Sequence, residues 1–109
     1  MDRMHEETFT DAEIATVIEQ GIVYTCACPA QVALALRHVR DLCRYQARCL
    51  ENPKTDQAVH SEIASSAAQA HDILQSCLLK IVEMEGWDRA TLQMPAGMRE
   101  LQINELTGE

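Results

Sequence analysis

The amino-acid sequence predicts an all-α protein, an antiparallel helical bundle built on a long hairpin of two helices. Three segments repeat apolar residues at spacings of three and four, which is the period of an amphipathic helix. The two longest segments are separated only by the break at Asn52 and Pro53, and a short connection makes consecutive helices antiparallel neighbours. No segment alternates apolar and polar residues for long enough to predict a strand.

The length and charge of the chain limit its class. A chain of 109 residues suits one domain, so we expect residues 1–109 to form a single helical domain. A net charge of −8 at pH 7 argues against nucleic-acid binding through the overall field. The first residues are too polar for a signal peptide, and no apolar run is long enough for a bilayer. We therefore expect a cytoplasmic protein that does not bind a membrane.

The first helix is predicted from a capping box. Thr10 is placed as N-cap with Glu13 three residues later, and Phe9 and Ile14 are spaced for a hydrophobic staple. The helix is expected to end between residues 24 and 26. Its apolar stripe comprises Ile14, Val17, Ile18, Gly21, Ile22 and Thr25.

The second helix is predicted over residues 29–50. Pro29 has no N–H to leave unsatisfied, so it suits the first helical position and makes Cys28 the N-cap. A second side of this helix carries four arginines, which we interpret as a solvated face: Arg37, Arg40, Arg44 and Arg48. The predicted core stripe comprises Val32, Ala35, Val39, Leu42, Gln46 and Cys49, widened by Leu36, Cys43 and Leu50.

The third helix is predicted to run from a cap at Thr55 or Asp56 to about residue 85, with Gly86 as its stop. Because it has more apolar surface than the first helix can cover, we expect two hairpins to complete a four-helix core by dimerisation. Its predicted core stripe comprises Val59, Ile63, Ala67, Ala70, Leu74, Cys77, Leu78 and Ile81.

The two ends of the chain are predicted to lie outside this core. Residues 1–9 form a polar arm that we expect to be disordered. Pro95 opens either a short last helix or a tail over residues 95–109, with Met98, Leu101 and Leu106 as its apolar residues.

Five cysteines in a chain without an export signal favour free thiols or metal ligands over disulfides. Counting back through the hairpin turn places Cys77 at about the level of Ala30, so Cys26, Cys28 and Cys77 are a candidate metal site. Three thiolates suit Cu(I), or Zn(II) with a fourth ligand. The same thiols suit a redox exchange with Cys28 as the attacking thiolate.

Simpler readings compete with these sites. Free cysteine often packs in cores as a small apolar residue. A second, looser cluster of Cys43, Cys49 and His60 is also conceivable from the register. His60 and His71 lie about three helical turns apart and are interpreted as histidines at a helix interface, while His38 is expected to be exposed and His5 lies in the arm.

Cysteines that line a small helical bundle resemble those of the cysteine-rich four-helix copper-storage proteins. The matching residues are Cys26, Cys28, Cys43, Cys49 and Cys77. That family places its cysteines at C-x-x-x-C spacing, and this chain has no such pair. The resemblance is therefore one of composition and does not imply high-capacity storage.

Two functions follow from the sequence. The chain lacks glycine-rich phosphate loops and the common nucleophile motifs, which argues against an enzyme. Alanine-rich stripes and few aromatic residues favour an interaction module, a homodimer or a binder of another protein. The alternative is a soft-metal or thiol-redox protein that uses Cys26, Cys28 and Cys77.

Overall fold

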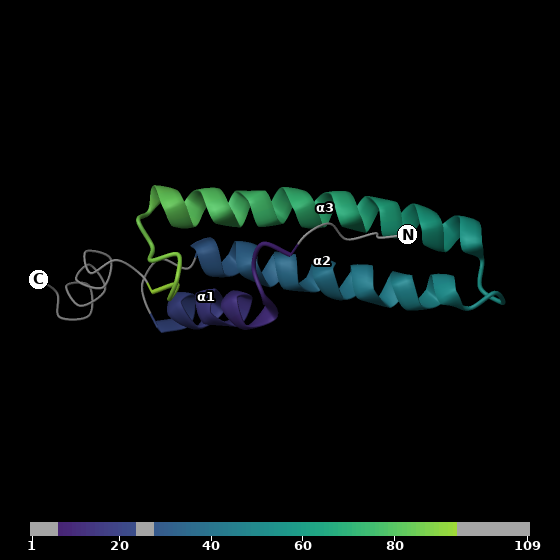
Figure 1. The fold of residues 1–109 in the computed structure, drawn as a ribbon, viewed down its shortest axis with the longest axis horizontal. Helices are drawn as coiled ribbons and strands as arrows, with labels where there is room; N and C mark the ends of the chain where they lie inside the picture. The colour runs from purple at the N-terminus through teal and green to yellow at the C-terminus, as the bar shows by residue number, and fades with distance from the viewer. Residues whose placement is uncertain (1–6, 24–27, 94–109) are drawn as a thin grey trace, which may run out of the picture.

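The computed structural model describes residues 7–23 and 28–93, which contain three helices and no strand. They are α1 (Asp11–Val23), α2 (Cys28–Glu51) and α3 (Gln57–Met84). The helices α2 and α3 form the predicted antiparallel hairpin, and α1 packs beside α2 at the end away from the hairpin turn (Figure 1). The all-α prediction is thus confirmed for this part of the chain.

The capping box of α1 is confirmed. The backbone N–H of Thr10 donates to Glu13 Oε1 at 2.9 Å, and the backbone N–H of Glu13 donates to Thr10 Oγ1 at 3.1 Å. These two bonds satisfy donors that the first turn of a helix leaves free. Residues 24–26, where we expected α1 to end, lie outside the described residues. The next helix, α2, begins at Cys28, one residue before the predicted start.

The turn between α2 and α3 is closed by side chains that the sequence identified. The Asp56 carboxylate accepts the backbone N–H of Val59 at 3.2 Å and is the N-cap of α3. The Thr55 hydroxyl donates to the Cys49 carbonyl at 2.7 Å. Thr55 therefore ties the turn to the end of α2, while Asp56 starts α3.

Gly86 ends α3 in a Schellman motif. Its φ of +77° is in the left-handed region, which glycine adopts without a Cβ clash. The N–H of Gly86 donates to the Glu83 carbonyl at 3.1 Å, and the N–H of Trp87 donates to the Val82 carbonyl at 2.8 Å. The reversal turns the chain back beside α1, where Trp87 and Leu92 are buried in the core (Figure 1).

The core lies at the α1 end of the hairpin. Phe9 is fully buried there, so the arm is anchored at this residue, whereas residues 1–6 lie outside the described part. The guanidinium of Arg89 stacks over the Phe9 ring at 4.3 Å from its centroid and donates to Glu13 Oε2 at 2.8 Å. The arm, α1 and residues 85–93 are therefore packed together as one cover. Residues 95–109 are also outside the description.

Most of the residues buried between α2 and α3 lie one position after those predicted for the core stripes. The predicted Val32, Val39 and Leu74 are only half-buried, and Leu42 and Val59 are 40% and 51% exposed. Leu36 and Cys43, predicted to widen the stripe of α2, are confirmed as buried, and so are Gln46, Ala67 and Leu78, which were predicted in the core stripes themselves. The buried residues are Pro29, Ala30, Ala33, Leu36, Arg40, Cys43 and Gln46 of α2 and Ala64, Ala67, Ala68, His71, Gln75, Leu78 and Val82 of α3.

The shift has a physical reason. Both helices carry two apolar stripes at helical spacing, and the less apolar one contains Arg40, His71 and Gln75. Burial of single polar groups is costly, so hydropathy alone favours the other stripe. When these groups satisfy each other, that cost falls and the stripe can face inward.

Substitutions at Gly86 test the stop of α3. Because the residue has a positive φ, Gly86→Ala is expected to lower the free energy of unfolding by about 1–2 kcal/mol. Nothing lies within 4 Å of a Cβ placed there, so the loss would come from the backbone alone. Gly86→Asn should lose less, because asparagine tolerates this region. Urea unfolding measures both, and equal stability of Gly86→Ala and the parent would contradict the motif.

Candidate functional site

The centre of the hairpin is a buried arginine. Arg40 is only 1% exposed, which corrects its predicted place on a solvated face. Its Nε donates to His71 Nε2 at 3.0 Å, its Nη1 to the Phe9 carbonyl at 2.7 Å and its Nη2 to Gln75 Oε1 at 3.0 Å. The same Gln75 oxygen accepts the Phe9 backbone N–H at 3.2 Å. One guanidinium thus joins α2, α3 and the arm.

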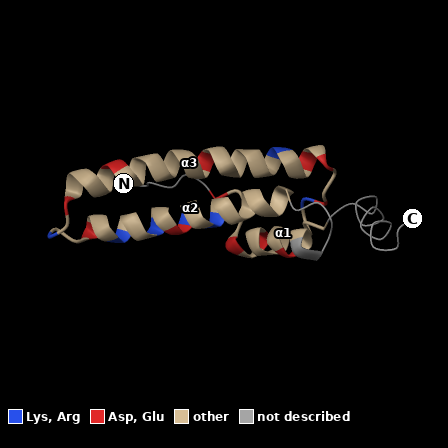
Figure 2. Ribbon diagram, turned by 180° about the vertical axis from the view of Figure 1, so that it is seen from behind, with Lys and Arg blue, Asp and Glu red and all other residues tan. Residues whose placement is uncertain are grey.

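Carboxylates at the start of the described chain complete this network. Asp11 Oδ1 accepts from Arg40 Nη1 at 3.1 Å, and Asp11 Oδ2 accepts from Arg44 Nη1 at 2.9 Å. Arg44 also donates to Glu7 Oε1 at 2.8 Å. Hydrogen bonds from Arg44 and Arg40 lower the pKa of Asp11. The arginines of α2, blue in Figure 2, therefore hold the N-terminus of α1 against the hairpin.

His71 is a neutral part of the network. Burial, and then the neighbouring charge of Arg40, lower its pKa. Its Nε2 accepts a hydrogen bond, so the ring proton is assigned to Nδ1, which has no hydrogen-bond partner among the described residues and lies 3.6 Å from Asp72 Oδ1. The placement confirms the interpretation of His71 as an interface histidine. Arg40, His71 and Gln75 are buried, so their role is structural.

The predicted thiol site is only partly within the described chain. Cys28 is exposed at the first residue of α2, and Cys77 is half-buried on α3. Cys26 lies outside the described residues, so the trio stays a prediction. Within residues 7–23 and 28–93, no group of three or more His, Cys, Asp or Glu side chains is placed to hold a metal ion.

The second thiol cluster is not assembled, which corrects that expectation. Cys43 is buried, and desolvation raises the pKa of its thiol. Cys49 is half-buried near the turn. The His60 ring bonds instead through Nδ1 to Gln46 Oε1, at 2.7 Å. His60 is therefore an interface histidine, as the simpler reading predicted, while His38 is exposed as expected and His5 lies outside the description.

An uncharged face lies on the other side of the hairpin. In both α2 and α3, every residue that immediately precedes a buried residue is uncharged. A step of one residue turns by about 100° around a helix, and on antiparallel helices equal steps lead to the same side of the pair. We call this surface the uncharged face. Its main residues are Val32, Ala35, Val39 and Leu42 of α2 and Ile63, Ala70, Leu74, Cys77 and Ile81 of α3.

The opposite side of the hairpin is the charged one. Residues that immediately follow buried positions include Arg37, Asp41 and Arg44 of α2 and Asp72 and Glu83 of α3. Because Arg44 binds Asp11, this is the side on which the arm and α1 lie. The uncharged face is therefore turned away from the cover that the described chain provides.

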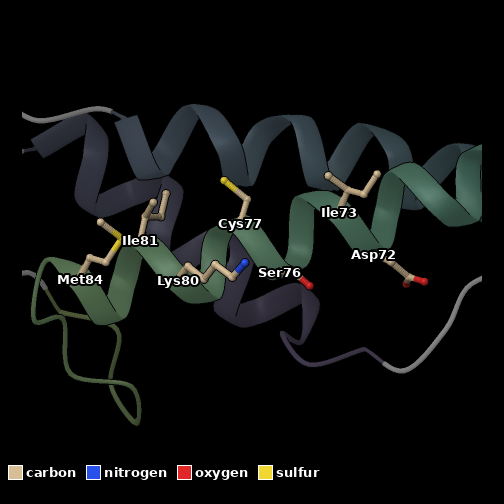
Figure 3. Close-up of a pocket in the computed structure, with 7 residues that line it drawn as sticks. All are labelled: Asp72, Ile73, Ser76, Cys77, Lys80, Ile81 and Met84. Carbon is tan, nitrogen blue, oxygen red and sulfur yellow. The ribbon is translucent and has the colours of Figure 1, made fainter.

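Part of the apolar surface of α3 is hollowed. An open depression of about 590 Å³ borders this helix, and Figure 3 shows Ile73, Cys77 and Ile81 along one edge of it. Ile73 is 69% exposed and Met84 82% exposed. Large apolar side chains this exposed mark a contact surface when they lie together. The other lining residues are Asp72, Ser76 and Lys80.

A smaller cleft between α1 and α2 is a weaker candidate. It has a volume of about 140 Å³ and is lined by three arginines, two aspartates and Ile14. Arg40 and Arg44 already bind Asp11 there. The chain's own carboxylate therefore occupies the place that an external anion would take.

Sequence reasoning missed Arg40, His71 and Gln75 as a unit. One signal was available: each interrupts an apolar stripe of helical spacing, and the antiparallel register brings the interruptions together.

No protein-family model matches the chain, and neither curated proteins nor solved structures show significant similarity to it. Among the described residues, no helix is long and apolar enough to cross a membrane.

Loss of Arg40 is expected to destabilise the fold strongly. Arg40→Ala would leave His71 Nε2 and the Phe9 carbonyl buried without the donor that Arg40 supplies, and would remove one of the hydrogen bonds to Gln75 Oε1, at about 3 kcal/mol or more in total. Arg37→Ala removes an exposed arginine one turn away and should change stability by less than about 0.5 kcal/mol. Urea unfolding distinguishes them, and similar values for both variants would contradict a structural role for the network.

His71 makes stability depend on pH. Its pKa is lower in the folded chain than the ordinary value of 6.5, so below that pH the unfolded state binds the extra proton and stability falls. One proton limits the slope to about 1.4 kcal/mol per pH unit. His71→Gln keeps an acceptor for Arg40 and should flatten the profile between pH 7.5 and 5.5, whereas the exposed control His38→Gln should not. An unchanged slope in His71→Gln would refute the assignment.

Proposed function

We propose that this protein is a helical interaction module whose working surface is the uncharged face of the α2/α3 hairpin. The observation that supports this most directly is the depression along α3, which Cys77 and Ile81 of this face line together with the exposed Ile73 and Met84 beside it. Such a surface is stabilised by covering it with another apolar surface. A second copy of the chain is the first candidate for that cover, which would complete a four-helix core.

The composition of the face suits helix-on-helix packing. Ala35 of α2 and Ala70 of α3 are small residues on the uncharged face, which let a second helix approach closely. Cys77, Ile81 and Leu74 are half-buried and offer further apolar area to a neighbour. Alanine-rich contacts between α2 and α3 bury little area per residue, so the hairpin gains from added cover.

The other side of the molecule supports the same division of roles. There the arm and α1 are bound by ion pairs from Arg40 and Arg44, so that side is already covered.

The proposal also includes a cytoplasmic location, because the described cysteines are free thiols and a reducing compartment suits them. The soft-metal and thiol-redox alternative depends on Cys26 and stays a prediction of the sequence.

An acidic substitution on the face tests the proposal. The chain has a mass of 12.2 kDa, and light scattering at micromolar concentration is expected to give about twice that mass. Ile73→Asp would bury a charge in the contact and should shift the protein to a monomer. Because Ile73 is 69% exposed in the single chain, helix content by circular dichroism should stay the same.

Ser65→Asp is the matched control for this experiment. Ser65 is also exposed on α3, but it lies about two helical turns from Ile73 and does not line the depression. This variant should remain a dimer. A parent protein that is a monomer, or a dimer that Ile73→Asp does not affect, would exclude the uncharged face as the dimer surface.

A further inference from the structure

We propose that His71 is the trigger of an acid-sensitive latch, which holds the described part of the arm, residues 7–9, against the hairpin. In the closed latch, neutral His71 accepts a hydrogen bond from Arg40, and Arg40 holds the Phe9 carbonyl. In mild acid His71 gains a proton and exchanges Arg40 for Asp72 as its partner, which releases the arm. The latch lies on the side of the arm and α1, so it goes beyond the proposed function of the uncharged face and does not depend on it.

The bond between Arg40 and His71 requires a neutral ring. A guanidinium only donates hydrogen bonds, so the ring nitrogen that faces Arg40 Nε at 3.0 Å must carry no proton. A protonated ring has an N–H on both nitrogens, which would set donor against donor and cation against cation. The two side chains are only 1% and 0% exposed, so water does not screen them from each other. Proton uptake by His71 therefore breaks this bond.

The other ring nitrogen already has an alternative partner in reach. Nδ1 of His71 is buried, has no hydrogen-bond partner among the described residues and lies 3.6 Å from Asp72 Oδ1. A protonated ring would form an ion pair with this carboxylate, whose side chain is 33% exposed. His71 thus lies between a cation that disfavours its proton and an anion that favours it. Each protonation state has its own partner, which is the property of a switch.

The charges around His71 come from every segment of the network. Burial, and then Arg40 of α2, lower the pKa of His71, whereas Asp72 of α3 and Glu7 of the arm act in the opposite direction. Asp11 of α1 accepts from Arg40 Nη1 at 3.1 Å, so it holds the guanidinium from the far side. The carboxylates on the arm and α3 therefore keep proton uptake within reach of mild acid.

The sign of the response follows from the two states of His71. Its pKa in the closed latch is below the ordinary value of 6.5, which the ring regains when the latch opens. The open state therefore binds the proton more tightly, and acid favours opening. Cys43, the buried thiol close to Arg40 and Asp72, stays neutral because desolvation raises its pKa, so it does not compete for this role.

The arm is the segment that the switch releases. Phe9 is fully buried, and its carbonyl accepts from Arg40 Nη1 at 2.7 Å. When Arg40 turns away, this buried carbonyl loses that donor and gains by moving into water. The hairpin itself has apolar residues buried on both sides of Arg40 and His71, and Thr55 closes its turn. We therefore expect α2 and α3 to stay together when the arm leaves.

Hydrogen exchange of the full chain, followed by NMR, tests the latch. The Phe9 amide, which donates to Gln75 in the closed state, reports on the arm, and the amides of residues 64–78 report on the hairpin. After correction for the intrinsic exchange rate, protection of the Phe9 amide is expected to fall about tenfold from pH 7.5 to 5.5, because one proton is taken up on opening. Protection of the hairpin should change by less than about twofold. An equal loss in both places, or no loss at the arm, would overturn the latch.

Three variants identify the trigger and its second partner. His71→Gln offers Arg40 an oxygen at either pH and takes up no proton, so protection of the Phe9 amide should be the same at pH 7.5 and 5.5. Asp72→Asn removes the carboxylate that receives the protonated ring, so opening should move to lower pH and the loss at pH 5.5 should be smaller than in the parent. Glu62→Gln, an exposed control more than two turns away on α3, should keep the full loss.

The variants decide the proposal even if one of them does not fold. Circular dichroism checks the helix content of each. A folded His71→Gln protein that still loses protection at the arm in acid would overturn His71 as the trigger. If His71→Gln does not fold, Asp72→Asn decides alone: a loss equal to that of the parent and of Glu62→Gln would overturn the exchange of partners.

Discussion

The rest of the structure depends on the burial of the Arg40 guanidinium. A buried charge costs several kcal/mol unless its donors find acceptors, and Arg40 finds them on three separate segments. His71 and Gln75 fix the register of α3, the Phe9 carbonyl fixes the arm, and Asp11 fixes the start of α1. Because the guanidinium is planar, its bonds specify orientation as well as distance. One side chain therefore positions every helix in the described chain.

This arrangement gives the hairpin two unlike sides. On one side the arm, α1 and residues 85–93 cover the helices, and Arg89 fastens that cover by stacking on Phe9 and binding Glu13. On the other side the described chain leaves the uncharged face, and the exposed Ile73 and Met84 lie beside it on α3. A small bundle can cover one side with its own segments and associate with a neighbour through the other side. The proposed contact through the uncharged face would leave the polar network in place.

The cysteines fit this division as well. Cys43 lies on the inward stripe, where burial disfavours its thiolate. Cys77 precedes the buried Leu78 and so belongs to the uncharged face, beside the depression on α3. The thiols of the described chain are thus distributed along the bundle, and their roles differ with position: Cys43 packs in the core, and Cys77 is available to a contact. The predicted trio depends in addition on Cys26, outside these residues.

The sequence alone determined the elements and their ends, because capping and stopping are local. Thr10 with Glu13, Asp56 and Gly86 act on backbone groups within a few residues, so their effects can be read without the fold. Helical periodicity likewise revealed the hairpin and two apolar stripes. Which stripe faces inward was decided only by tertiary structure, because the cost of burying Arg40 depends on His71, Gln75 and Phe9, which lie about thirty residues away. The outward position of the more apolar stripe, and with it the candidate docking surface, follows from that long-range compensation.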